Sequence, residues 1–128
     1  MTKAFWDAIE TAMTGLGYVL ASDEASLSNR RYTITVDTTP SENEVRGAMF
    51  SGKVRVGQEY EIRVQYQESK KNPRRSRDIA VDQETIIPAI AGITANGWTG
   101  HYFVGASMEE AEGGSISTIA FHLEGTVS

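Results

Sequence analysis

The strongest constraint on the fold is a strict alternation of apolar and polar residues over residues 59–67. A period of two is typical of a β-strand that has one face in the core and the other in water. The apolar set is Tyr60, Ile62, Val64 and Tyr66, and the polar set is Glu61, Arg63, Gln65 and Gln67. The sequence therefore predicts a sheet covered on one face only, and other parts of the chain must supply that cover.

Two segments have the spacing of amphipathic helices. One spans residues 5–16, where Thr2 is a candidate N-cap and Gly15 and Gly17 suit a left-handed C-terminal stop. The other spans residues 79–93, where Asp78 is the expected cap and Pro88 is expected to bend the helix or free one carbonyl. The apolar residues of the first segment follow the i, i+3, i+4, i+7 pattern: Phe5, Ala8, Ile9, Ala12, Met13 and Leu16.

Further strands are predicted over residues 32–36, from about 101 to 108, and over 117–123. Turns are expected at 96–100 and 109–114, a short edge strand or arm at 53–56, and an extended arm or loop at 38–57. The order is helix, strand, strand, helix, strand, strand. The predicted class is a single α+β domain over residues 1–128. Its antiparallel or mixed sheet has about four to five strands, with two helices packed on one face.

Composition excludes several classes of site. The chain has no cysteine, so disulfides, thiolate metal sites and cysteine nucleophiles are absent. It has no run of about 18 apolar residues and no apolar N-terminal signal, so we expect a soluble, cytoplasmic protein without membrane contact. Nucleophile-elbow and phosphate-loop motifs are also missing.

Charge is distributed unevenly along the chain. Residues 1–45 carry three Lys or Arg and seven Asp or Glu, residues 46–77 carry nine and three, and residues 78–128 carry none and seven. The net charge of −5 is thus the sum of −4, +6 and −7. Such asymmetry either favours assembly, in which a basic face of one subunit meets an acidic face of the next, or is chance patterning in a short chain.

The densest basic cluster lies in the predicted connection over residues 68–78. We weigh three interpretations: contact with a neighbouring subunit, contact with phosphate groups, or a solvated connection whose charges keep a sheet edge soluble. No aromatic residue is interleaved with the cluster, which disfavours stacking on single-stranded nucleic acid. Its members are Lys70, Lys71, Arg74, Arg75 and Arg77.

Catalytic and metal-binding patterns are weak. Neither His101 nor His122 has a metal-ligand spacing, and each is expected to be a surface or edge-strand histidine. The carboxylate groups at 59/61 and 109/110/112 lie on a predicted wet face and in a predicted turn. We therefore expect no enzyme, cofactor or metal, and keep His101 with Glu61 as weak candidates for an enzymatic or ligand-binding alternative. Trp6 and Trp98 are expected either at a subunit interface or at the rim of the core.

The layout resembles the tail terminator proteins of long-tailed bacteriophages. The resemblance covers most of the chain, although no invariant motif carries it and residues 38–57 depart from the compact pattern. Related neck and tail-completion proteins share this layout. The segments that carry the resemblance are the helix over 5–16, the strands over 31–36 and 60–66, the helix over 79–93, and the hairpin of 101–108 with 117–123.

The resemblance implies a structural role in a virion. Proteins of this family form a hexameric ring that caps the tail tube, stops its polymerisation and joins the tail to the head connector. It thus implies a homo-oligomer, a tail tube protein and a neck protein as partners, DNA passing through the lumen, and a location in the virion after assembly in the host cytoplasm. Within this interpretation, the five basic residues of the cluster are expected at a subunit contact or facing the lumen, because a ring needs two different complementary patches on each copy.

Overall fold

The computed structural model describes residues 3–21, 30–36, 41–42, 54–67, 75–94, 98–111 and 113–127. The predicted α+β class is confirmed, and the predicted element order is matched approximately, because two short strands (β1 and β3) lie between the predicted elements. The elements are α1 (Lys3–Gly15), β1 (Val19–Leu20), β2 (Arg31–Val36), β3 (Ser41–Glu42), β4 (Val54–Gln67), α2 (Arg75–Ala91), β5 (Trp98–Ala111) and β6 (Gly114–Val127).

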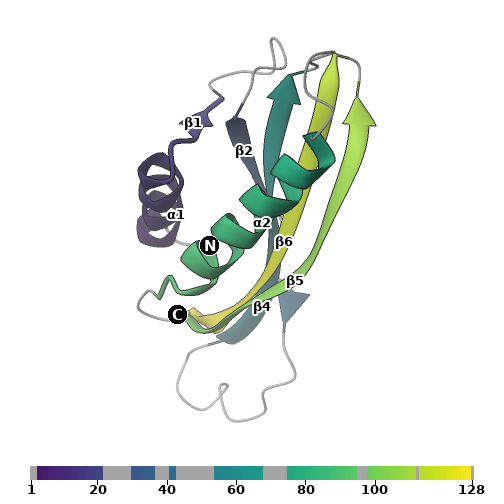
Figure 1. Ribbon diagram of the computed structural model, residues 1–128. Helices are drawn as coiled ribbons and strands as arrows, with labels where there is room; N and C mark the ends of the chain where they lie inside the picture. The colour runs from purple at the N-terminus through teal and green to yellow at the C-terminus, as the bar shows by residue number, and fades with distance from the viewer. Residues whose placement is uncertain are drawn as a thin grey trace.

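The strands form one mixed sheet. β1, β2, β4, β6 and β5 follow one another across it, and β3 pairs with β4 outside this path. β1 and β2 are parallel, and every other described pair is antiparallel. Figure 1 shows the long ribbons of β4, β6 and β5 side by side, with α2 lying across one face. The edges of the described sheet are therefore β1 with β2 on one side and β5 on the other.

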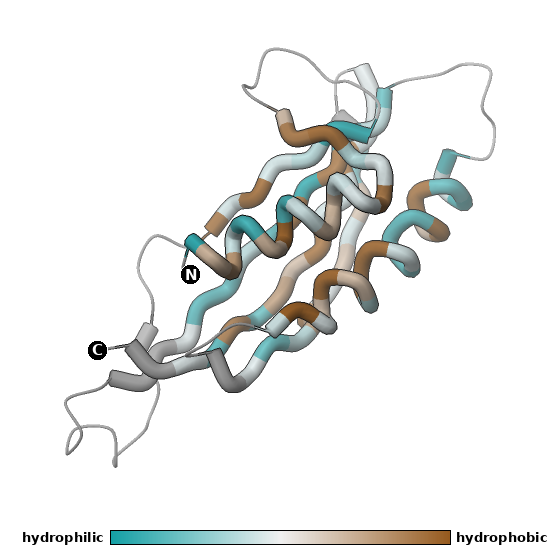
Figure 2. The backbone as a smooth tube through the Cα atoms, turned by 90° about the vertical axis from the view of Figure 1, so that its left-hand side faces the viewer, coloured by the Kyte–Doolittle hydropathy of each residue, from teal (hydrophilic) through white to brown (hydrophobic). Residues whose placement is uncertain are grey.

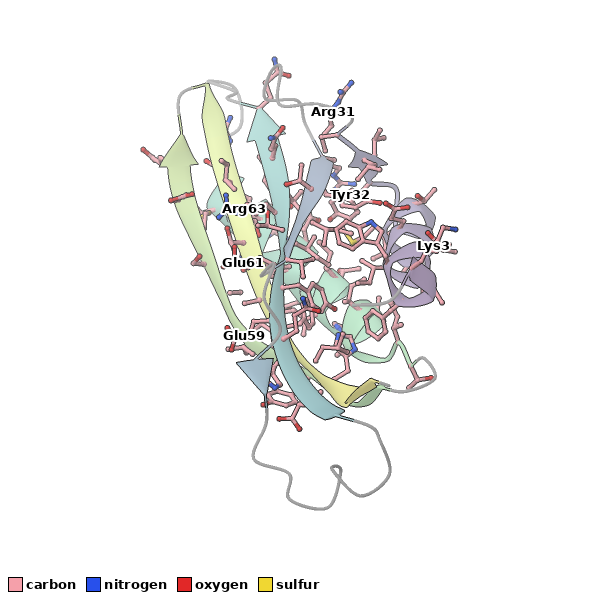
Figure 3. The ribbon with its side chains drawn as sticks, turned by 180° about the vertical axis from the view of Figure 1, so that it is seen from behind. Lys3, Arg31, Tyr32, Glu59, Glu61 and Arg63 are labelled. Carbon is pink, nitrogen blue, oxygen red and sulfur yellow. The ribbon has the colours of Figure 1, made fainter. Side chains whose placement is uncertain are left out.

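The core lies between this sheet and the helices. α2 lies in front of the sheet in Figure 1 and behind it in Figure 3, so the opposite face carries no described helix. Apolar positions alternate with polar ones along the strands and recur on both helices in Figure 2. The largest fully buried side chains come from both layers: Phe5, Ile9, Met13, Tyr32, Tyr60, Ile62, Ile79, Ile86, Ile90, Ile119, Phe121 and Leu123.

Helix α1 confirms the predicted apolar stripe and its glycine stop. Phe5, Ile9 and Met13 are fully buried at one face of the helix. Gly17 has a φ of 94°, its N–H donates to the carbonyl of Thr14, and the N–H of the following residue donates to the carbonyl of Met13. These paired bonds satisfy carbonyls that the last helical turn leaves free. Thr2, the candidate N-cap, lies outside the described residues.

Strand β4 is longer than predicted. Residues 54–56, expected as a short edge strand or an arm, are strand, but they begin β4 and pair with the end of β6 instead of forming a separate edge strand. Part of the arm expected over 38–57 is also sheet, because Ser41 and Glu42 pair with Gly57 and Val56. Pairing with β3 on one side and β6 on the other decides this part of β4, and the alternation near Gly57 is too short to show the strand. Residues 38–40 and 43–53 lie outside the described part.

Helix α2 begins earlier than predicted. It starts at Arg75, so Asp78 lies within its first turn and is not the residue that caps it, and it ends at Ala91 rather than at 93. A carboxylate in the first turn is still favourable, because it faces the positive end of the helix dipole. Pro88 lies inside the helix. The basic connection therefore ends before Arg75, and the two arginines at 75 and 77 are helical.

The C-terminal hairpin is tighter than predicted. Ala111 pairs with Gly114, so the acidic turn expected over 109–114 shrinks to residues 112–113, and Glu109 and Glu110 belong to β5. Gly113 has a φ of 82°, a conformation that favours glycine in a two-residue hairpin loop. Gly100, expected in a turn, lies inside β5 beside a register shift. The strands predicted at 101–108 and 117–123 are confirmed and extended.

Candidate assembly surface

Strand β5 exposes a row of large apolar side chains at one edge of the sheet. Tyr102, Phe103, Val104 and Met108 are between 39% and 51% exposed. Val104 is an extra residue in the ladder. Phe103 pairs with Phe121, and Gly105 pairs with Ala120, the residue beside Phe121 in β6. Such a bulge interrupts the alternation, so consecutive apolar residues reach solvent here.

The opposite edge carries the second exposed apolar group. Val19 and Leu20 of β1 are 58% and 44% exposed, and they pair only with Arg31 and Tyr32 of β2. Apart from Val81 on α2, every large apolar side chain that is exposed in the described part of the chain lies on one of these two edges. Figure 3 shows the edges on opposite sides of the molecule, with β5 on the left and β2 on the right.

The bare face of the sheet is polar. Glu59, Glu61 and Arg63 follow one another along β4 on this face (Figure 3), and the guanidinium of Arg63 lies 3.3 Å from the carboxylate of Glu61. The His122 ring lies 3.1 Å from the Glu124 carboxylate and 3.8 Å from that of Glu59. Carboxylates thus outnumber cations along these central strands, which makes this face a poor match for phosphate groups.

His101 lies in the edge strand β5, one of the two predicted positions, and it points to the helix side of the sheet, where it is half-buried. Its Nδ1 lies 3.2 Å from the carbonyl oxygen of Ile93, so Nδ1 carries the proton and donates it there. Nε2 then accepts from the Tyr60 hydroxyl at 2.6 Å. Burial lowers the pKa of His101. The ring also packs edge-on against Phe5, at 4.9 Å between ring centroids. The two nitrogens therefore join β4 and Ile93 to β5, and the ring packs against α1.

The structure does not bring together the two residues kept for an enzymatic site. His101 shares the helix side with Tyr60, whereas Glu61 is the next residue of β4 and points to the bare face. Among the described residues, no group of three or more His, Asp or Glu side chains is arranged to hold a metal ion. The helices of the described part are too short or too polar to cross a membrane.

The predicted basic cluster is only partly described. Lys70, Lys71 and Arg74 lie outside the described residues. A guanidinium nitrogen of Arg75 donates to the carbonyl oxygen of Gln67 at 2.6 Å and joins the start of α2 to the end of β4. Arg77 is exposed on the first turn of α2. Arg75 thus makes a contact within its own chain, and Arg77 is the described member that is open to solvent.

A polar cluster that the sequence did not reveal joins β2, β4 and α2. Arg30, at the start of β2, has a φ of 60°, and its guanidinium lies 3.4 Å from Asp82 and 5.7 Å from the centre of the Tyr18 ring. The Tyr66 hydroxyl donates to the other Asp82 oxygen at 2.9 Å. Burial, and then the Asp82 charge, raise the pKa of Tyr18 to about 12. Four residues from separate segments have no common spacing, so only the fold brings them together.

The two tryptophans lie on different elements, Trp6 on α1 and Trp98 on β5. Trp6 is half-buried on α1, and its Nε1 donates to the Glu10 carboxylate at 2.9 Å, which agrees with a position at the rim of the core. Trp98 begins β5, and its side chain lies outside the described part.

No protein-family model matches this chain, and no curated protein matches it.

Proposed function

We propose that this protein is a structural subunit of a homo-oligomeric ring, resembling a phage tail terminator, that caps a tail tube, stops its growth and joins it to the neck. The observation that carries the proposal is the β5 edge. This strand has fourteen residues, and its four exposed apolar side chains lie at an edge of the described sheet. Another neck component would use the same surface, and the tube experiment below separates the two roles.

An open edge of this kind needs a partner. Proteins commonly protect edge strands with lysine, proline or very short strands, because unpaired N–H and C=O groups recruit other chains. β5 contains neither lysine nor proline, and its charges, Glu109 and Glu110, lie together near one end. Covering Tyr102, Phe103 and Val104 would remove apolar surface from water, which favours association. These features support assembly as the role of the strand.

Charge supports an assembly of different patches. Residues 78–128, which include β5 and β6, contain no Lys or Arg, whereas residues 46–77 carry nine. Opposite charges on separate surfaces of one subunit favour head-to-tail contacts, and such contacts close into rings when the rotation between copies allows it. Lys70, Lys71, Arg74 and Arg77 are proposed for the basic side of such a contact or for the lumen.

The test combines oligomeric state with tube growth. The tail tube protein from the same genome is polymerised with and without this protein, and tube lengths are measured by negative-stain microscopy. We expect shorter tubes with a ring at one end, and native mass spectrometry is expected to detect multimers of the subunit. Unchanged tube lengths and unoccupied tube ends would overturn the terminator role, whereas a ring that binds the neck but leaves tube length unchanged would assign the neck role.

A matched pair of variants tests whether β5 is the assembling edge. Val104 on β5 and Val81 on α2 are each 50% exposed, so replacing either with lysine makes the same change at equal exposure. V104K is expected to abolish multimers and tube capping, because it places a charge in the edge. V81K is expected to retain both. If V104K assembled as well as V81K did, β5 would not be the contact.

A further inference from the structure

We infer that the β5 edge of one copy pairs with the β1–β2 edge of the next copy, antiparallel, and so continues the sheet around the ring. This inference rests on the proposed ring and names the contact that closes it. The partner is a second copy, because the exposed apolar side chains of the described sheet lie at these two edges, and one residue of each group, Leu20 and Met108, ends the same row of the sheet.

Strand direction is consistent with this contact. β5 runs antiparallel to β6, β6 to β4, and β4 to β2, while β1 is parallel to β2. β5 therefore runs opposite to both strands of the other edge. Rotation about a ring axis along the strands keeps strand direction, so β5 of one copy meets β1 of its neighbour antiparallel. Antiparallel pairing is slightly more stable than parallel pairing and needs no rearrangement of either edge.

The register within the sheet places apolar residues at both ends of one row on the helix side. Leu20 pairs with Tyr32, Tyr32 with Val64, Val64 with Ser117, and Ser117 with Met108. The two ends of this row, Leu20 and Met108, are 44% and 46% exposed. When the sheet continues at constant height, Met108 of one copy contacts Leu20 of the next.

The adjacent row carries opposite charges on the bare face, with Glu109 at one end and Arg31 one strand inside the other end, which is Val19. Arg31 pairs with Gln65, Gln65 with Ile116, and Ile116 with Glu109. Arg31 and Glu109 are both exposed, and Figure 3 shows Arg31 where β2 begins. Glu109 of one copy thus reaches the height of Arg31 in the next, one strand beyond Val19. A charge pair beside an apolar pair fixes both the height and the direction of the contact.

Cysteine cross-linking tests the register directly, because the chain has no cysteine of its own. The double variant L20C/M108C is oxidised, and its products are separated under denaturing, non-reducing conditions. Each copy then carries both halves of the contact, so we expect a ladder of trimers and larger species. Each single variant is expected to give no cross-link, because its cysteine faces Met108 or Leu20 of the neighbour. L20C/V81C is the matched control, with a second cysteine on α2 at 50% exposure against 46% for Met108, and is expected to give no ladder.

Each other result has a defined meaning. A double variant that gives only dimers, or no cross-link, would overturn the contact, and dimers from M108C alone or from V104C would indicate β5 pairing with β5 instead.

Charge reversal tests the same contact. R31E is expected to reduce the multimers, and R31E/E109R is expected to restore them. E84R, with Arg31 unchanged, is the charge control and is expected to leave the multimers as they are. A ladder without tube capping would retain the contact and overturn the proposed function. Tube capping without a ladder would retain the proposed function and overturn the contact.

Discussion

The hydrogen bonds of His101 predict a specific loss of stability in mild acid. In the folded protein its Nδ1 donates to the Ile93 carbonyl and its Nε2 accepts from Tyr60, so the neutral ring satisfies both partners. A second ring proton would face the Tyr60 hydroxyl in a half-buried site, and burial lowers the pKa of His101 below 6.5. The unfolded chain has no such constraint and binds a proton near pH 6.5.

The direction and the size of the effect follow from proton linkage. Below pH 6.5 the unfolded state binds more protons at this residue than the folded state, so stability falls as pH falls and is fully present above that value. Between pH 7.5 and pH 5.5, a single histidine with an unfolded pKa near 6.5 can remove at most about 1.4 kcal/mol from the free energy of unfolding. The slope steepens toward about 1.2 kcal/mol per pH unit at pH 5.5, and decreases again below the folded pKa.

Urea unfolding, followed by tryptophan fluorescence at intervals between pH 5.5 and pH 7.5, measures this slope. H101Q removes the titrating group, so its unfolding free energy should lose the His101 contribution to the slope, whatever its absolute stability. H122Q provides the control, because the other histidine lies on the bare face and its loss should leave the His101 contribution in place. A wild-type slope that survives in H101Q would refute the reasoning, as would one that disappears in H122Q alone.

Three further changes test the local structure by urea unfolding. G17A should destabilise the protein by about 1–2 kcal/mol, because residue 17 has a φ of 94°, which favours glycine. G15A should be neutral or stabilising, because residue 15 lies inside α1 and an added Cβ would meet no atom within 4 Å. Y66F should cost about 1–3 kcal/mol, since it leaves an Asp82 oxygen without its donor. Y32F should cost under about 0.5 kcal/mol, because its hydroxyl is buried without a hydrogen bond in the described part. Equal losses in Y66F and Y32F would contradict this account.

Local patterns predicted the elements that a single layer of contacts determines. The alternation at 60–66 and the apolar stripe at 5–16 each follow from one buried face, and both were confirmed. The patterns failed where a tertiary contact decides an end. The charge of Arg75 and the neighbouring proline predicted a loop. Arg75 is instead the first residue of α2, and its side chain bonds to the Gln67 carbonyl at the end of β4. The extra residues 54–57 of β4 likewise depend on pairing with β6.

The candidate surface was harder to predict than the fold. The sequence indicated the charge asymmetry, and from it an assembly of unlike patches, but it directed attention to the basic cluster rather than to β5. Exposure of Phe103 and Val104 depends on where β5 lies in the sheet, and strand order is not encoded in local spacing. Arg30 and Asp82 are 52 residues apart and meet only in the folded chain.

The bulge at Val104 explains both the weak sequence pattern of β5 and its fitness for the inferred contact. Residues 101–108 have no single alternation, because the phase changes at the extra residue. If Val104 paired with Ala120 in a regular ladder, the pairing beyond Phe103 would shift by one residue. Met108 would then face the bare side opposite Ile116, and Glu109 would face the helix side opposite Ser115. The bulge instead puts Met108 in the row that ends at Leu20, and Glu109 in the row that contains Arg31 and ends at Val19. Because Val104 stays unpaired in the bulge, the row of Met108 and Leu20 and the row of Glu109 and Arg31 are aligned at once, which is what a head-to-tail contact between copies requires.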